Sequence, residues 1–177
     1  MPLIKDGRQI ADKWLKLADD AEVFGTAPII VSLDRWNEEK DSLLKLNLEI
    51  GVLLESCQSP ELIEDDLENF SLVALNFPSF GDGRAYSYAR ILRERYGFEG
   101  EVRAIGDVLY DQVQLMHRCG FDTLEIENAA TLRSLNRNKS ADVNVFYQPT
   151  GDGEKTASSL RKRLLDSHKE LGYEKAS

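Results

Sequence analysis

The sequence has few of the residues from which metal and redox centres are built. Its 177 residues include two cysteines and two histidines. Cys57 and Cys119 lie far apart and neither belongs to a C-x-x-C pair, so the chain lacks the ligands for its own iron–sulfur or cysteine-based metal cage. With only His117 and His168, a histidine metal triad is excluded. We therefore expect two reduced thiols and no metal site.

Long apolar runs and an excess of positive charge are also missing. No run approaches the roughly 20 residues that span a bilayer, and the N-terminal residues resemble neither a secretory signal nor an Arg-rich transit peptide. The chain has 22 basic and 31 acidic residues, a net charge of -9, which disfavours binding to a phosphate backbone. We expect a cytoplasmic protein that binds neither nucleic acid nor membrane.

Regular alternation of short apolar runs and helical segments is the main positive signal. The runs are rich in β-branched residues or leucine, and each is followed by a polar corner and apolar residues at three- and four-residue spacing: PIIVSL, IGVLLE, SLVALNF, EVRAIG, DTLEIE and VNVFYQ. This predicts an α/β domain of strand-helix units with a mainly parallel sheet, either partial-barrel-like or open and doubly wound. Asp6-Gly7 between apolar residues predicts an N-terminal β-ribbon.

Polar residues mark where the helices begin and where the domain ends. Asp34 and Ser59 are the expected N-caps of two helices, and Gly120 is the expected C-terminal stop of a third. After Gln148 the chain becomes a polar, Gly-containing linker followed by a solvated helix. We therefore assign residues 1–148 to the α/β domain and residues 149–177 to an appendage.

In parallel α/β folds, ligands bind beyond the carboxyl ends of the strands. The polar residues expected there are Asp34, Arg35, Glu55, Ser56, Ser79, Asp82, Arg84, Asp107, Glu127, Asn128 and Gln148. Several acids around one opening can bind Mg²⁺ or exchange protons, although helix capping explains the same residue types. Among the acids, Asp107 and Asp82 are the candidate catalytic carboxylates.

The stretch FGDGRAYS is the candidate anion site. Glycines let backbone N–H groups turn toward an anion, and a helix start with basic and hydroxyl side chains adds donors, so the site residues are Gly81, Gly83, Arg84 and Ser87. The stretch matches neither the Walker pattern nor the full dinucleotide fingerprint. The alternative is a turn in which both glycines adopt left-handed backbone angles and Asp82 caps the helix.

The helix after this corner, together with Arg95 and Arg103, makes the most basic part of an acidic chain, and we expect these arginines to be solvated and paired with Glu94, Glu99 and Glu101. Its spacing places Tyr88, Ile91 and Leu92 inward, and Arg90 and Arg93 outward, where acidic neighbours can pair with them. A second polar stretch begins at Gly106-Asp107 and continues with Asp111 and Gln112 in the first turn of the next helix. His117 and Cys119 are two residues apart, so they do not share a helix face and are not expected to form a nucleophilic pair.

Taken together, PLIKDGR, FPSFGDGRAYSYARILRERYGFEGEVRAIGDVLYDQVQLMHRCGFDTLEI and VFYQ resemble the bacterial domain-of-unknown-function family 934 over residues 2–148. The resemblance singles out these motif positions: Phe77, Pro78, Phe80, Asp82, Gly83, Arg84, Ser87, Arg90, Arg93, Gly106, Asp111, Gln112, Arg118, Gly120, Phe121 and Asp122. It implies an oxidoreductase role in sulfite reduction, with no catalytic role established for any of these residues.

Three functions are compatible with this resemblance and with the residues themselves. The first is an accessory protein of assimilatory sulfate and sulfite reduction that acts with sulfite reductase as a partner or electron-transfer adaptor. The second is an enzyme or binding protein for a small anion at the GDGR corner, and the third is a scaffold without chemistry. The cofactor is either none or a flavin whose phosphate binds at the Gly83 helix start, because the sequence has no nucleotide fingerprint, no cysteine cluster and no histidine pair for haem.

Overall fold

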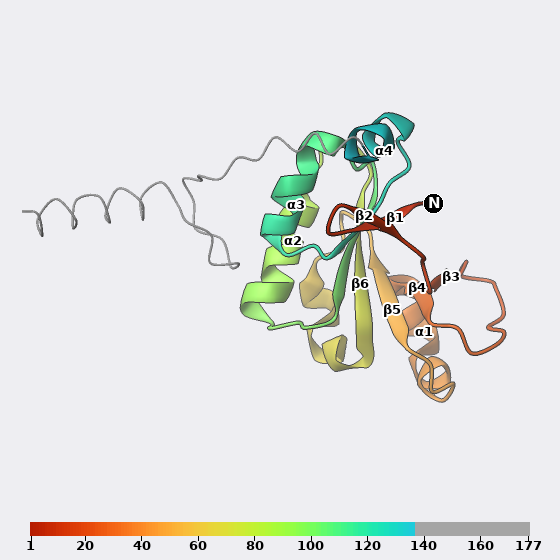
Figure 1. The fold of residues 1–177 in the computed structure, drawn as a ribbon. Coiled ribbons are helices and arrows are strands. Elements are labelled where there is room, and N and C mark those ends of the chain that lie inside the picture. The colour runs from red at the N-terminus through yellow and green to blue at the C-terminus, as the bar shows by residue number, and fades with distance from the viewer. Residues whose placement is uncertain (137–177) are drawn as a thin grey trace, which may run out of the picture. The chain divides into compact units, whose positions relative to one another are not determined.

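The computed structural model of the chain describes residues 1–136, which form one mixed sheet with helices packed against it (Figure 1). Within this range the sheet has eight strands in the order β2-β1-β8-β7-β6-β5-β4-β3. The strands are β1 Leu3–Lys5, β2 Arg8–Ile10, β3 Leu15–Lys16, β4 Ile29–Ser32, β5 Ile50–Leu54, β6 Phe70–Phe77, β7 Glu101–Gly106 and β8 Thr123–Glu125. The strand expected at residues 143–148 and the appendage expected at 149–177 lie outside the described residues.

The sheet is curled into a half-barrel, and most of its strands are parallel. Strands β3 to β8 stand side by side in chain order, whereas β1 pairs antiparallel with both β2 and β8. The predicted α/β fold with a mainly parallel sheet and an N-terminal β-ribbon is therefore confirmed. Asp6 and Gly7 form the ribbon's turn with positive φ angles, as the Asp-Gly pair predicts.

A helical segment follows each of the strands β4 to β8. These segments are α1 Leu33–Leu44, η1 Pro60–Asn69, α2 Arg84–Arg90, η2 Ile91–Arg95, η3 Tyr110–Gln112, α3 Val113–Cys119 and α4 Ala129–Asn136. Ser59 caps η1 and Gly120 ends α3 in a left-handed conformation, as predicted. The prediction for α1 was wrong, because Ser32 Oγ accepts the Arg35 N–H as the cap and Asp34 lies inside the first turn. No helix within residues 1–136 is long and apolar enough to cross a membrane.

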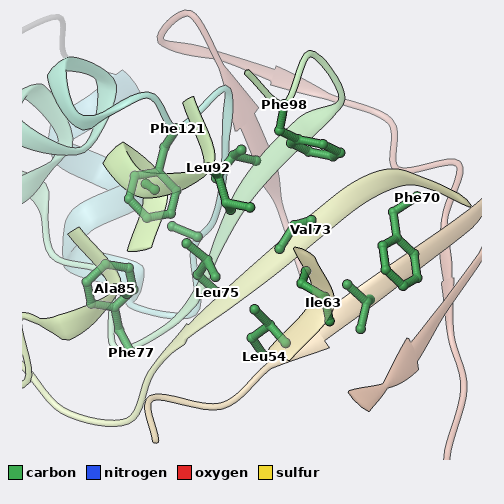
Figure 2. Packing of buried hydrophobic residues seen from close by; sticks show 14 of the residues in the cluster. Leu54, Ile63, Phe70, Val73, Leu75, Phe77, Ala85, Leu92, Phe98 and Phe121 are labelled. Carbon is green, nitrogen blue, oxygen red and sulfur yellow. The ribbon is translucent and has the colours of Figure 1, made fainter. Parts of the chain in front are cut away.

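The larger core lies between the helices and the sheet. Leu54, Val73, Leu75 and Phe77 point from neighbouring strands toward helix residues such as Ala85, Leu92 and Ile63 (Figure 2). The Phe77 ring also packs against Phe121 at 5.8 Å between ring centroids. Because alternate strand residues face opposite sides, this core takes every second residue of each strand.

The other face of the sheet, which we call the inner face, carries the remaining alternate residues. Trp14, from the segment before β3, packs there with Ile30, Leu53, Leu72, Ala74 and Ile105. Arg103 lies on the same face and only 1% of its side chain is exposed. Its guanidinium pairs with Asp12 at 2.7 Å and with Glu101 at 2.8 Å, so the buried charge is compensated. Arg103 was expected to be a solvated arginine paired with Glu101, and that prediction is correct only for the pairing.

Arg93 corrects a second prediction. It was expected to point outward into solvent, but its guanidinium donates to the carbonyl oxygens of Phe98, Gly100 and Gly120 and to the Asp122 carboxylate. The same carboxylate accepts the backbone N–H of Val102 at 2.7 Å. Arg93 thus joins the end of η2, the start of β7 and the loop before β8. The ion pair between Arg93 and Asp122 links the stretches RERYG and RCGFD.

Tyr86, on α2, has a hydroxyl group that is buried without a hydrogen-bond partner among the described residues. Burial raises the pKa of this phenol to about 12. We expect Tyr86→Phe to leave the free energy of unfolding unchanged or to increase it by up to about 1 kcal/mol, because no native hydrogen bond is lost.

The comparison of the two proteins as a function of pH checks this expectation. Below about pH 10 the phenol is neutral in both the folded and the unfolded protein. As the pH rises toward 12, only the unfolded tyrosine ionises, so the unmodified protein loses stability. The stability difference between Tyr86→Phe and the unmodified protein should therefore grow over this range, as measured by urea unfolding. A large loss of stability at pH 7 would mean that the hydroxyl has a partner.

Candidate functional site

A polar hollow of about 410 Å³ lies at the carboxyl ends of β6, β7 and β8. Its walls are formed by Asn76, Phe77, Pro78, Gly106, Asp107, Val108, Glu127 and Asn128. Four of these residues carry polar side chains, and none is basic. The loops expected to converge at the edge of the sheet therefore do so for β6, β7 and β8, with Asp107, Glu127 and Asn128 in one place.

Hydrogen bonds tie two side chains of the hollow to neighbouring segments. Asn76 Nδ2 donates to Glu55 Oε2 at 2.5 Å, which links the ends of β5 and β6. Asn128 Oδ1 accepts the backbone N–H groups of Ala130 and Thr131, at 2.8 Å and 3.2 Å, and so caps α4. The capping explanation is thus correct for Asn128, whereas the structure gives Glu127 no such role.

Asp107 faces the loop after β6 and does not cap a helix. Its Oδ2 accepts the backbone N–H of Phe80 at 2.9 Å, and its own N–H donates to the carbonyl oxygen of Phe77 at 2.8 Å. The preceding residue, Gly106, has a φ of 89°. Asp107, at the end of β7, therefore holds the loop between β6 and α2, which begins at Pro78. Its role as a catalytic carboxylate remains a prediction.

The GDGR corner lies beside the hollow and has an internal ion pair. Arg84 Nε donates to Asp82 Oδ1 at 2.9 Å, and Arg84 Nη2 contacts Asp82 Oδ2 at 2.6 Å. The same Nη2 donates to Ser56 Oγ at 2.9 Å, and Ser56 lies in the loop after β5. Hydrogen bonds from Arg84 hold the pKa of Asp82 well below its usual range, so this carboxylate stays ionised at neutral pH.

The two glycines of this corner do not adopt the left-handed angles of the turn interpretation. Gly83 has a φ of -93°, and Gly81 is not among the residues with positive φ. That part of the turn prediction was wrong, although Asp82 Oδ1 does accept the Arg84 backbone N–H at 3.3 Å. Ser87 is exposed on α2. An anion at Gly81, Gly83, Arg84 and Ser87 competes with Asp82 for the guanidinium.

The remaining motif residues have mainly structural positions. Phe77 is buried, and Gln112 Oε1 accepts the backbone N–H of Leu109 at 3.1 Å. Arg90 pairs with Glu94 at 2.9 Å, Arg118 is half-buried on α3 and Asp111 is exposed. Pro78 is also exposed, and Phe80 is the exception among the aromatic motif residues, because 56% of it is exposed at the edge of the sheet.

Sequence reasoning missed two side chains at this edge and on the inner face. Asn76 stands inside a strand, where its neighbours are apolar, and only the period-2 alternation of SLVALNF indicates that it faces away from the helix-covered core. Trp14 precedes a strand too short to give a pattern.

Within residues 1–136, no group of three histidine, cysteine or acidic side chains is placed to hold a metal ion. The hollow is best suited to hydrogen bonds with polar or positively charged groups.

The model of a family described as bacterial protein of unknown function (DUF934) matches residues 51–158. A search of curated proteins found no match. The matched range contains the GDGR corner, Gly106-Asp107 and the ion pair between Arg93 and Asp122.

Proposed function

Because this chain belongs to the bacterial family of unknown function DUF934, we propose that it is an accessory protein of assimilatory sulfite reduction that docks onto sulfite reductase. The resemblance described above supports the pathway, which supplies sulfide for cysteine biosynthesis. The mode of action is association with the enzyme, as a partner or electron-transfer adaptor. The docking surface is the carboxyl edge of the half-barrel.

One observation carries the choice of this surface. The loop of the signature stretch presents Phe80 to solvent, while hydrogen bonds hold the loop in place: Asp107 accepts the Phe80 N–H, and Ser79 O accepts the Asp82 N–H at 3.0 Å. Because the loop backbone is held, only the two χ angles of the Phe80 side chain remain to be ordered on binding, and aromatic side chains are enriched at interfaces. Beside it lies an open hollow that an anchor of the partner can enter.

The charge of this edge indicates the chemistry of the partner. Asp107 and Glu127 line the hollow without a basic residue, and Asp82 already neutralises Arg84. Opposite charges across an interface raise association rates and exclude partners of like charge. The surface of sulfite reductase that binds here should therefore carry lysine or arginine, and binding should weaken as salt concentration rises.

Two pairs of variants test the docking proposal. Glu127→Lys reverses a charge in the hollow, and we expect it to weaken binding to purified sulfite reductase about ten-fold or more, as measured by calorimetry. Its control is Glu99→Lys, which makes the same change at an exposed residue before β7, at the opposite edge of the sheet. Phe80→Ala should cost about 2 kcal/mol of binding free energy, and Phe24→Ala, at an exposed phenylalanine before β4, should cost little.

The outcome that contradicts the proposal is equally concrete. If the two full-length proteins show no complex at micromolar concentration, the docking function is wrong. If they bind but both lysine variants bind alike, the partner uses another surface. An absorption spectrum of the purified protein separates the adaptor from a flavoprotein, because a bound flavin absorbs visible light.

The GDGR corner supports a second candidate, a small-anion site, through one contact. Arg84 and Ser56 lie in different segments of the chain, and Arg84 Nη2 donates a hydrogen bond to Ser56 Oγ at 2.9 Å. Since Asp82 occupies the guanidinium, Asp82→Asn should strengthen binding of sulfite or phosphate, and Arg84→Ala should abolish it. Arg90→Ala is the matched control. Calorimetry that detects no binding to the Asp82→Asn protein would end the anion hypothesis.

A further inference from the structure

A short segment crosses the inner face of the half-barrel from one edge of the sheet to the other. Residues 11–14, which we call the strap, join β2 to β3, and these are the two edge strands. The chain from Ile10 to Leu15 reaches at most about 18 Å, whereas eight strands side by side measure about 34 Å along the sheet. The strap is therefore a chord across the open side of the curl, and Asp12 and Trp14 contact the inner face beneath it.

Side chains alone attach the strap to the sheet. Among residues 1–136, no backbone hydrogen bond joins the strap to a strand. Asp12 accepts hydrogen bonds from Arg103 Nη1 at 2.7 Å and Nη2 at 3.1 Å, and Lys13 pairs with Glu49 at 2.5 Å. Both members of the second pair are at least half exposed, and such pairs contribute little to stability. Asp12 and Trp14 are therefore the main attachments.

The packing of Trp14 against the sheet is favourable but incomplete. Its side chain packs with Ile30, Leu53 and Ile105, and only 9% of the residue is exposed. The indole Nε1 atom, however, is buried without a hydrogen-bond acceptor among the described residues. A cavity of about 70 Å³ also remains, lined by Trp14 and these three residues. A buried donor without a partner and an unfilled space both reduce the free energy gained when the strap closes.

Arg103 keeps a partner when the strap is released. Its guanidinium also contacts Glu101, through Nε at 2.9 Å and Nη2 at 2.8 Å. This carboxylate still neutralises the guanidinium when Asp12 leaves, and water reaches the groups that the strap covered. Opening therefore leaves no uncompensated buried charge, which is the main penalty for separating a buried ion pair.

We propose that the strap is a lid that opens and closes over the inner face while the rest of the sheet stays folded. A short segment without backbone hydrogen bonds to its neighbours opens at a lower free energy than the whole domain unfolds. The closed strap keeps Ile30, Leu53, Ile105 and Arg103 buried, and the open strap exposes them to solvent. The strap thus controls access to a surface separate from the carboxyl edge of the sheet.

Hydrogen exchange of the indole N–H groups, measured by nuclear magnetic resonance on the full-length protein, tests the proposal. The chain has two tryptophans, and Trp14→Phe identifies the Trp14 signal by its loss. Trp36 is the internal control, because it is fully buried and its Nε1 donates to Asp66 at 2.8 Å. Trp14 should exchange at least about ten-fold faster than Trp36. Urea below the unfolding transition should accelerate Trp36 far more than Trp14, because opening of the strap exposes little surface.

A pair of variants tests the attachment of the strap. Asp12→Asn removes the charge that pairs with Arg103, and it should speed the exchange of Trp14 about ten-fold without making it dependent on urea. Glu49→Gln makes the same carboxylate-to-amide change at the exposed ion pair and should change this rate by less than about two-fold. If Asp12→Asn does not fold, the urea dependence of the unmodified protein decides alone. The proposal is overturned if both indoles exchange at the same rate with the same urea dependence, or if the two variants affect Trp14 alike.

Discussion

Replacing Gly106 by alanine is expected to lower the free energy of unfolding by about 3 kcal/mol or more. Gly106 ends β7 with a φ of 89°, a conformation that costs an L-residue about 1–2 kcal/mol. A Cβ atom there would also clash with the carbonyl oxygen of Phe77 and lie 2.6 Å from Asn76 Oδ1. These oxygens belong to β6, so relief requires the two central strands to separate at the hollow.

Gly97→Ala is the matched control for this substitution. Gly97 also has a positive φ, of 62°, but a Cβ atom there meets nothing within 4 Å. Its expected cost is therefore only the conformational cost, about 1 kcal/mol. Urea unfolding followed by circular dichroism compares the two variants. Equal losses would show that β6 and β7 yield without cost, and would contradict the close packing described for this edge.

The strands of this fold could be predicted from sequence because their signals are local. Runs such as SLVALNF and EVRAIG concentrate β-branched and leucine residues, and they became β6 and β7 at the expected places. Ser59 and Gly120 were predicted correctly because capping depends on residues within one helical turn. The choice between a half-barrel and an open sheet could not be made, because it depends on strand order.

Contacts between segments distant in the sequence explain what could not be predicted. Arg103 is buried because Asp12, 91 residues away, reaches its guanidinium. The pairing of Arg84 with Asp82 is local, yet the contribution of Ser56 comes from the previous strand-helix unit. Charge patterns along the sequence showed that arginines were numerous near residue 90. They did not show which of them is structural.

Arg93→Ala is expected to reduce the free energy of unfolding by about 3 kcal/mol. The guanidinium is 23% exposed and holds three carbonyl oxygens and the Asp122 carboxylate. Hydrogen bonds that involve a charged group each contribute about 1.5–3 kcal/mol, and the partial exposure of Asp122 lets water replace some of them. Denaturant unfolding at neutral pH measures the loss.

Arg90→Ala, one helical turn earlier, is the control for charge and helix propensity. Among residues 1–136, Arg90 pairs with Glu94 alone, and both side chains are at least 40% exposed, so the expected loss is about 0.5 kcal/mol. Arg93→Lys separates charge from geometry, because a single ammonium group cannot reach acceptors at Phe98, Gly120 and Asp122 together. Lysine should therefore restore less than half of the lost stability. Full restoration would mean that the Asp122 ion pair alone stabilises this junction, and that the carbonyl contacts contribute nothing.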